Sequence, residues 1–363
     1  MPYITIGILG SGQLGRMLAV AAAQLGIKTH IFAPDANCSP AGEVASNATT
    51  AAYDDYAALD QFAASVDVIT SEFENVPSQT MVHLAQIRTV SPGITALHIA
   101  QHRVREKNLV RQHGILTPDF WHVTNAGSLH HAMAELRGRG VLKTCQLGYD
   151  GKGQIWIDPS DDLDASFAAL GSDDAILEAA VDFTAEASFL VARTADGRIA
   201  HFPASLNTHK NGILARSVAP APISENLITT GQLAVQRLAE AMELIGVLTL
   251  ETFVTTDGKL LFNEIAPRPH NSFHWTIEGC ATSQFTQLAR CLAGMALGGT
   301  DSYGQWQMDN LLGEDMSSLE ELAAESGLHL HLYGKASAKT GRKMGHTNRL
   351  ITPSTACYIS QPV

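Results

Sequence analysis

The chain has 363 residues, of which 45% are hydrophobic and 17% charged, so it is long enough for two or three domains and is not disordered in composition. The 36 acidic and 24 basic residues give a net charge of −12, which disfavours a nucleic-acid partner because no basic field is present to replace phosphate counterions. No apolar run approaches the roughly 18 residues of a membrane span, and five cysteines without C-x-x-C spacing predict reduced thiols, so we expect a cytoplasmic protein with no membrane partner.

Strands and helices alternate over the first hundred residues. Residues 3–9 are predicted to form a buried strand, and apolar side chains then recur at helical spacing until Gly26. The remaining elements predicted here are strand 28–32, helix 54–64, strand 67–73, helix 77–86 and strand 88–92. Because strands that alternate with helices form a parallel sheet covered on both faces, we predict a Rossmann-like α/β domain over residues 1–103.

The first strand ends in a glycine fingerprint. Gly10, Gly12 and Gly15 follow G-x-G-x-x-G spacing, and N–H groups at the start of the next helix can hold an anion. Asp35 lies twenty residues after Gly15, near the position of a ribose-binding acid in dinucleotide sites. NAD is therefore one candidate ligand. A tight β–α turn that contacts a small ligand or none has the same spacing, and the fingerprint does not decide between them.

A second block follows a long predicted helix over 95–112. Its strands are expected at 140–144, 155–158 and 175–179, and the turn-rich "QLGYDGKGQ" (146–154) joins the first two. This pattern predicts a small central α+β domain over residues 104–182.

The rest of the chain is predicted to be a C-terminal α+β domain, residues 183–363. Hairpin turns are expected at Asp196-Gly197 and Asp257-Gly258. Helices are expected over 227–245 and 282–297, followed by a polar, poorly patterned stretch to about 326 and by "LHLHLYGK…GRKMGH" (328–346).

Two glutamates lie symmetrically about the second hairpin turn. Glu251 precedes the turn by six residues and Glu264 follows it by six, which places both carboxylates on one face at cross-strand distance. Such a pair in mainly apolar strands is costly unless a cation neutralises it. Oxygen ligands suit Mg²⁺, which takes one or two carboxylates plus nucleotide phosphates. A surface charge pair is the alternative, against which the apolar flanks argue.

Glycine and basic residues indicate anion binding elsewhere. Gly148, Gly151 and Gly153 form a loop able to fold over phosphates, and Lys143 on the preceding strand carries a compact positive charge. Polar and basic side chains that could hold a phosphate monoester also gather in the C-terminal domain, although solvated loop charges are the alternative for the last three. These residues are Arg268, His270, Asn271, Lys335, Arg342 and Lys343.

Together these features resemble the ATP-grasp superfamily, which combines a Rossmann-like N-terminal domain, a small central lid domain and a C-terminal α+β domain with acidic Mg²⁺ ligands. Five stretches resemble the N5-carboxyaminoimidazole ribonucleotide synthetase family in particular: "GILGSGQLGRM", "EFENVP", "LKTCQLGYDGKGQ", "NEIAPRPHNSFHWT" and "LYGK…GRKMGH". The similarity runs from residue 4 to about 347. It implies ATP-dependent carboxylation of 5-aminoimidazole ribonucleotide by bicarbonate through carboxyphosphate, which gives ADP and phosphate.

The resemblance also implies roles for individual residues. ATP would contact Arg103, Lys143, Gly148, Tyr149, Asp150, Gly151, Lys152, Gly153, Gln154, Glu178, Ala179, Ala180, Val181, Glu186, His209, Asn263 and Glu264. Glu251 and Glu264 would hold Mg²⁺. The ribonucleotide would contact Gln13, Leu14, Glu72, His270, Asn271, Lys335, Arg342 and Lys343, with Glu74 a weaker candidate than Glu72. Tyr149, Asp150 and Lys152 would be catalytic, near bicarbonate and the transferred carboxyl group, and Arg268 would be a further catalytic residue beside the ribonucleotide and its phosphate.

Two departures from the family pattern accompany these roles. Cys145-Gln146 stands where relatives often carry basic residues, and Phe273 replaces a usual glycine beside Asn271. The family further implies a homodimer. An NAD-dependent oxidoreductase and an inactive ATP-grasp binding subunit are the rival interpretations.

Overall fold

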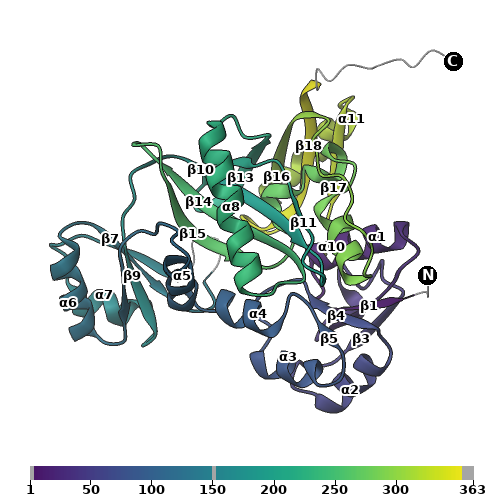
Figure 1. The fold of residues 1–363 in the computed structure, drawn as a ribbon, viewed down its shortest axis with the longest axis horizontal. Helices are drawn as coiled ribbons and strands as arrows, with labels where there is room; N and C mark the ends of the chain where they lie inside the picture. The colour runs from purple at the N-terminus through teal and green to yellow at the C-terminus, as the bar shows by residue number, and fades with distance from the viewer. Residues whose placement is uncertain (1–3, 149–152, 354–363) are drawn as a thin grey trace.

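A computed structural model describes residues 4–148 and 153–353 of the chain. The described strands form three sheets, of five, nine and four strands. The four-stranded sheet lies at one end of the molecule and the five-stranded sheet at the other, with the nine-stranded sheet between them (Figure 1).

The five-stranded sheet is parallel, with the strand order β3-β2-β1-β4-β5. Its elements are β1 (Thr5–Leu9), α1 (Gln13–Gln24), β2 (Lys28–Ala33), β3 (Asn47–Thr50), α2 (Tyr56–Ala64), β4 (Val68–Ser71), α3 (Ser78–Ala85) and β5 (Thr89–Val90). The predicted alternation of strands and helices is confirmed. The short edge strand β3 was not predicted, because the sequence "NATT" has no apolar alternation.

The prediction of one helix over 95–112 is wrong. The structure has α4 (Ile94–Ala100) and α5 (Arg103–Gln112), separated where His102 adopts extended backbone. Gln101 at this break donates its side-chain amide to the carbonyl oxygens of Glu74 (2.7 Å) and Val76 (2.8 Å). These hydrogen bonds hold the junction between α4 and α5 against the loop after β4. The break sets the direction of α5.

The four-stranded sheet has the order β6-β9-β7-β8. Its elements are β6 (Phe120–Val123), α6 (Ala126–Leu136), β7 (Gly140–Thr144), β8 (Gln154–Ile157), α7 (Leu163–Leu170) and β9 (Ala175–Ala179). We call this unit the central sheet, because its residues lie in the middle of the chain, between those of the other two sheets. It has a hydrophobic core of its own, built from side chains such as Leu129, Leu142 and Leu177.

The nine-stranded sheet runs β15-β14-β10-β12-β13-β16-β18-β17, with β11 paired to β10. Its elements are β10 (Phe183–Arg193), β11 (Ile199–His201), β12 (Ser205–Lys210), β13 (Ile213–Ala219), α8 (Glu225–Ala241), β14 (Gly246–Thr255), β15 (Leu260–Ala266), α9 (Thr276–Gly279), α10 (Gln284–Leu292), β16 (Gly304–Leu312), α11 (Leu319–Ala324), β17 (Leu328–Leu332) and β18 (Lys343–Pro353). Both predicted hairpins are confirmed by the pairs β10–β11 and β14–β15. The stretch expected to be poorly patterned contains β16. The buried positions of this strand include Gly304 and Asn310, so the sequence does not show a clear alternation of apolar and polar residues.

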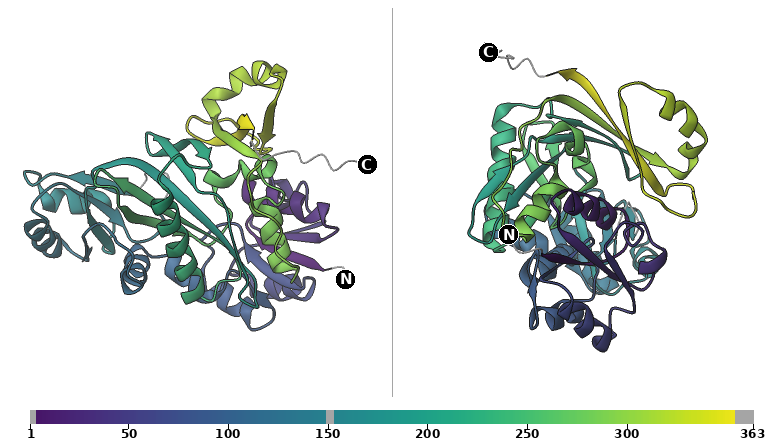
Figure 2. Two further views of the ribbon diagram at one scale, coloured as in Figure 1. Left: turned by 45° about the horizontal axis from the view of Figure 1, so that its top comes forward. Right: turned by 90° about the vertical axis from the view of Figure 1, so that its right-hand side faces the viewer.

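One hydrophobic core joins the five-stranded sheet to the nine-stranded sheet. Helix α10 packs against α1 on one side and against β10 and β14 on the other. The shared cluster includes Ile8 and Leu18 from the first sheet unit and Phe285 and Leu288 from α10. Figure 2 shows these two units in contact from two further directions. Within residues 4–148 and 153–353, no helix combines the length and apolarity needed to cross a bilayer.

Candidate active site

The glycine fingerprint at the end of β1 holds a carboxylate of the chain itself. Glu72 follows β4, and its side chain accepts hydrogen bonds from the backbone N–H groups of Gly12 and Gly15, the latter at 2.6 Å. A Cβ atom at Gly10 would lie 2.4 Å from Cγ of Glu72, and one at Gly12 would lie 2.8 Å from Oε1. The glycines are therefore needed to let the Glu72 side chain approach the loop.

This arrangement argues against NAD. The Glu72 carboxylate lies on the N–H groups at the start of α1, where the pyrophosphate of a dinucleotide would bind. A second anion at the same place would find the N–H groups of Gly12 and Gly15 already bonded to Glu72. Asp35 is also engaged, since it accepts a 2.6 Å hydrogen bond from the Ser11 hydroxyl.

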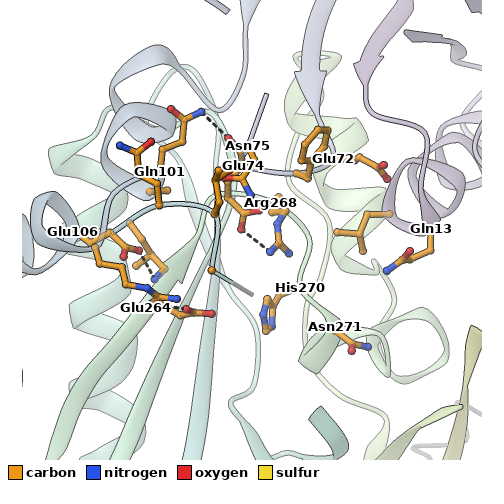
Figure 3. A pocket seen from close by; sticks show the side chains of 18 of the residues that line it. Gln13, Glu72, Glu74, Asn75, Gln101, Glu106, Glu264, Arg268, His270 and Asn271 are labelled. Carbon is orange, nitrogen blue, oxygen red and sulfur yellow. Dashed lines mark hydrogen bonds and ion pairs between the residues drawn. The ribbon is translucent and has the colours of Figure 1, made fainter. Parts of the chain in front are cut away.

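Two cavities meet beside this loop. The first cavity, of about 350 Å³, lies between the five-stranded and nine-stranded sheets (Figure 3). The second cavity, of about 300 Å³, lies between the central sheet and the nine-stranded sheet. Five side chains line both cavities, namely Arg103, Glu264, His270, Asn271 and Lys343. A ligand in one cavity would thus lie next to a ligand in the other across a wall of charged and polar groups.

Most residues predicted for the site line one of the two cavities. The first is lined by Gln13, Leu14, Glu72, Glu74, Gly148, Arg268, His270, Asn271 and Lys343. The second is lined by Arg103, Lys143, Gln154, Glu178, Ala179, Ala180, Val181, Glu186, His209, Glu251, Asn263 and Glu264. The structure therefore brings the residues predicted for the ribonucleotide and those predicted for ATP into two neighbouring spaces.

A few predicted residues lie elsewhere. Lys335 donates to the carbonyl oxygen of Lys343 at 2.7 Å, and Arg342 donates to that of Ser337 at 3.1 Å, and neither side chain lines the two cavities. Gly153 pairs its carbonyl with the N–H of Thr144 and also lies outside the lining. Tyr149, Asp150, Gly151 and Lys152 lie outside the described residues.

Glu251 and Glu264 lie directly opposite each other on β14 and β15, as predicted. From Val254 to Thr252 the strands pair in one register, and a β-bulge at Asn263 then shifts it by one residue. Without the bulge, Glu251 would face Asn263. Because of it, the consecutive residues Asn263 and Glu264 both line the second cavity, although strand neighbours ordinarily point to opposite faces.

Burial and the repulsion between the two carboxylates dominate the electrostatics of Glu251, although cations lie nearby. Burial and the neighbouring Glu264 carboxylate raise the pKa of Glu251 to about 7. Arg103 donates to Glu264 at 3.2 Å, and Nε2 of His270 lies 3.5 Å from Oε1 of Glu251. Burial, helped by the charges of Arg268 and Lys343, lowers the pKa of His270 well below its usual value, so the imidazole is neutral at pH 7 and does not balance the charge.

Behind the second cavity, Glu178 on β9 binds two lysines. Its carboxylate lies 3.3 Å from Nζ of Lys107 and 3.0 Å from Nζ of Lys143, and the Glu178 and Lys107 side chains are only 4% and 1% exposed. Burial opposes ionisation of Glu178, but the charges of Lys107, Lys143 and Arg103 outweigh it and lower the pKa of Glu178 to about 2. Glu178 therefore positions Lys143 at the cavity wall in addition to lining the cavity itself.

Several residues that contribute to the site were not predicted from the sequence. Glu106 lines the first cavity and accepts from the backbone N–H of Ile265 at 3.0 Å, and Lys107 donates to the carbonyl oxygen of Asn263 at 3.2 Å. With Arg103, they form one charged face of α5 at helical spacing. That spacing of charged residues, at positions i, i+3 and i+4 of one predicted helix, was the available signal. The aromatic residues Trp156, Phe183 and Phe253 of the second cavity had no comparable signal.

The loop after β15 is held in place by polar contacts. Gln284 of α10 accepts from the backbone N–H of His270 and donates to its carbonyl oxygen, both at 2.8 Å. The Asn271 amide is bonded reciprocally to Asn310 of β16. Phe273 points into the core and is fully buried, while Asn271 keeps its place in both cavities, so the phenylalanine does not displace it.

Three family models match successive parts of the chain. They are a ribonucleotide synthetase preATP-grasp domain (residues 3–101), an ATP-grasp domain (108–285) and a phosphoribosylaminoimidazole carboxylase C-terminal domain (307–357). The chain is also 47% identical over 356 residues to N5-carboxyaminoimidazole ribonucleotide synthase of Brucella melitensis, with 98% of each chain covered. The chain belongs to the N5-carboxyaminoimidazole ribonucleotide synthase family. It is therefore an ATP-grasp ligase.

Solved structures of family members agree with this assignment. The chain is similar to the Staphylococcus aureus N5-carboxyaminoimidazole synthetase complexed with ADP, with a TM-score of 0.91 and 35% identity over 96% of this chain and 93% of that one. It is also similar to the Aspergillus clavatus enzyme in complex with ADP and 5-aminoimidazole ribonucleotide, with a TM-score of 0.89 and 27% identity over 96% and 94% of the two chains.

The role of Glu72 in the glycine loop can be tested by Glu72→Gln. The amide has nearly the same size, but its NH₂ group would face one of the two backbone N–H donors. We expect the free energy of unfolding to fall by about 1–3 kcal/mol, because a buried donor loses its acceptor. Urea unfolding measures this change, and Glu43→Gln is the matched control, since its side chain is 55% exposed. Equal stabilities of the Glu72 variant and the unaltered chain would contradict the role.

The buried pair of Glu178 and Lys107 predicts a pH-dependent contribution to stability. Because the pKa of Glu178 is about 2 in the folded chain and 4.5 ordinarily, its contribution is complete above pH 4.5 and is lost as the pH falls toward 2. We expect Glu178→Gln to lower the free energy of unfolding by about 3 kcal/mol at pH 7, since it leaves a buried lysine without its carboxylate.

Urea unfolding at several pH values would test this prediction. The difference between the Glu178 variant and the unaltered chain should shrink between pH 4.5 and pH 2. Glu320→Gln on the exposed side of α11 serves as control and should change little at any pH. A Glu178→Gln difference that stays constant down to pH 2 would show that the ion pair is not its cause.

Proposed function

We propose that the chain carboxylates 5-aminoimidazole ribonucleotide with bicarbonate at the expense of ATP. The observation that carries the proposal is the shared wall of the two cavities, where Arg103, Glu264, His270, Asn271 and Lys343 border both spaces. ATP in the second cavity and the ribonucleotide in the first would present their reacting groups to each other across this wall. The ADP and ribonucleotide bound by the Aspergillus clavatus relative support this pairing of ligands.

The second cavity suits a nucleoside triphosphate. Val141, Leu214 and Phe253 line it with apolar surface that would face the adenine, and Phe183 packs on Phe253 with ring centroids 4.8 Å apart. Arg103 belongs to the shared wall and Lys143 also lines this cavity, so both could contact the phosphates. Cationic groups there would stabilise the charge that develops as the γ-phosphoryl group moves to bicarbonate.

Arg268 is the group we place next to bicarbonate and the carboxyphosphate formed from it. Its guanidinium lines the first cavity and pairs with Glu74 at 2.5 Å, while its buried Nε has no hydrogen-bond partner among the described residues. An anionic substrate oxygen would satisfy that donor. The amine of the ribonucleotide then attacks the carboxyl carbon of carboxyphosphate, phosphate leaves, and a proton is lost from the nitrogen. Tyr149, Asp150 and Lys152 stay predicted catalytic residues.

Glu251 and Glu264 would hold Mg²⁺. The residues fit this ion because they lie opposite each other on adjacent strands and line the same cavity, and because burial and the neighbouring Glu264 carboxylate raise the pKa of Glu251. Mg²⁺ prefers such oxygen ligands together with phosphates. When bound, the ion would neutralise charge on the transferred phosphoryl group.

The remaining parts of the proposal concern the domains, the oligomeric state and the location in the cell. We assign an N-terminal substrate domain to residues 1–103, a central domain to 104–182 and a C-terminal domain to 183–363. A homodimer in the cytoplasm is also proposed, on the basis of the family resemblance. Sedimentation velocity tests the dimer, which would be rejected if the chain sediments as a monomer at every concentration up to the micromolar range.

The carboxylation can be tested by ADP release. We expect release only when ATP, bicarbonate and 5-aminoimidazole ribonucleotide are all present. Glu264→Gln should lower kcat at least about 100-fold, because the transferred phosphoryl group loses its charge stabilisation. Circular dichroism should show that the variant is folded.

Asp257→Asn is the control for this assay, because Asp257 lies exposed at the turn of the same hairpin and should leave kcat unchanged. ADP release driven by formate and a glycinamide ribonucleotide instead would move the chain to a transformylase activity. Normal turnover in the Glu264 variant would reject the metal assignment.

A further inference from the structure

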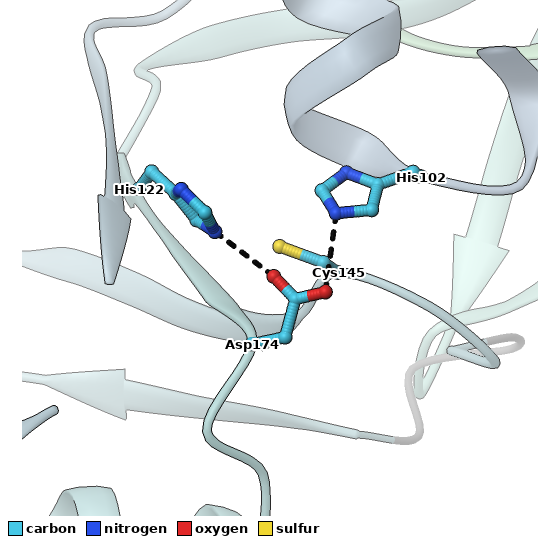
Figure 4. Close-up of side chains that lie close together, drawn as sticks. All are labelled: His102, His122, Cys145 and Asp174. Carbon is cyan, nitrogen blue, oxygen red and sulfur yellow. Dashed lines mark hydrogen bonds and ion pairs between the residues drawn. The ribbon is translucent and has the colours of Figure 1, made fainter. Parts of the chain in front are cut away.

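Four side chains of mixed chemistry converge beside the start of α5 (Figure 4). His102 lies just before α5, His122 on β6, Cys145 directly after β7 and Asp174 directly before β9. One ligand atom from each lies within 4.8 Å of the ligand atoms of the other three. The function proposed above gives these four side chains no role in the reaction.

The Asp174 carboxylate lies at the centre of the cluster. Its Oδ2 is hydrogen-bonded to Nε2 of His102 at 3.1 Å, and its Oδ1 to Nε2 of His122 at 2.9 Å. The side chains of His102 and Cys145 are buried, whereas those of His122 and Asp174 are 46% and 36% exposed. The cluster is therefore closed on the protein side and open to solvent on the other, which gives an ion a path of entry.

The donor set selects for a particular class of metal. A thiolate, two imidazoles and a carboxylate are ligands of zinc, whereas Mg²⁺ and Ca²⁺ favour oxygen ligands alone. Tetrahedral zinc with bonds of about 2.0–2.3 Å places its ligand atoms roughly 3.3–3.8 Å apart. The four donors would thus move inward by only about 1 Å to surround an ion.

We propose that His102, His122, Cys145 and Asp174 bind one zinc ion. Four protein ligands complete a tetrahedral shell, which is typical of a structural site and leaves no position for a substrate. Zinc with one thiolate and one carboxylate has no net charge, so the ion adds no uncompensated charge to a half-buried place.

Binding of the ion must displace the proton of the Cys145 thiol. In the two histidines, whose Nε2 atoms donate to Asp174, the proton must move to Nδ1 so that Nε2 can bind the ion. Burial and the adjacent Asp174 carboxylate raise the pKa of Cys145 above its usual range, so the group is a thiol when no metal is bound. The proton passes to solvent as the zinc–sulfur bond forms. Zinc affinity should accordingly increase with pH.

The site would fasten two parts of the molecule whose apolar cores are separate. Cys145 already accepts a backbone hydrogen bond from Arg103 and donates one to the carbonyl oxygen of Asp174, both at 3.0 Å. Residues 145–148 line the first cavity, and Arg103 reaches Glu264. Zinc would therefore fix the central sheet and the start of the glycine segment against α5.

Metal binding to the full chain would test the proposal. After chelator treatment, the chain should take up one zinc ion, measured by elemental analysis, and its melting temperature should rise. Cobalt(II) should give the absorption band of a thiolate–cobalt bond. Cys145→Ser should abolish this band and weaken zinc binding at least about 10-fold.

Two further variants make the outcome unambiguous. Cys38→Ser removes an exposed thiol outside the cluster and should leave zinc uptake and the cobalt band unchanged. His122→Ala alters a half-exposed side chain and should weaken binding even if Cys145→Ser fails to fold. The proposal is overturned if the unaltered chain shows no thiolate–cobalt band, if Cys38→Ser abolishes it, or if the His122 variant binds zinc as tightly as the unaltered chain. In each of those cases the four residues form only a hydrogen-bond network around Asp174.

Discussion

The site depends on one constraint, which is that two carboxylates face each other on adjacent buried strands. Glu251 and Glu264 cannot both be ionised there without nearby positive charge. The chain supplies Arg103 from the start of α5, Arg268 from the loop after β15 and Lys343 from β18. Because these cations come from separate segments, the requirement to balance one strand pair determines where the neighbouring elements must lie.

Helix α5 supplies one of these cations and is held against β15 by three of its side chains. Successive turns of one face bind Glu264 through Arg103, the backbone of Ile265 through Glu106, and the backbone of Asn263 through Lys107. Lys107 also reaches Glu178 in the central sheet, whose hydrophobic core is separate from that of the nine-stranded sheet. The described contacts between α5 and the central sheet therefore include a buried ion pair, which is directional in a way that apolar packing is not.

Patterns in the sequence were sufficient for the parallel sheet and the hairpins, because each follows from residues close together in the chain. The opposition of Glu251 and Glu264 was predicted from their symmetry about the turn, but in the structure it also requires the bulge. Three features could not be predicted in this way. The bulge at Asn263 depends on pairing along the whole strand, the break at His102 depends on contacts with the loop after β4, and the Glu72 carboxylate reaches the glycine fingerprint from 57 residues beyond Gly15. A spacing motif predicts the shape of a loop. The group that binds inside the loop, here a side chain of the same chain, is determined by tertiary structure.

The wall between the two cavities has a consequence for ligand design. Since the same five residues border both spaces, one molecule could occupy the two cavities together with only a short connecting group at Glu264 and His270. Joining two modest binders across this wall would make the second contact intramolecular, so the affinity would be set by effective concentration as well as by either half. Selectivity would then come from the junction, because such a molecule would need both spaces side by side.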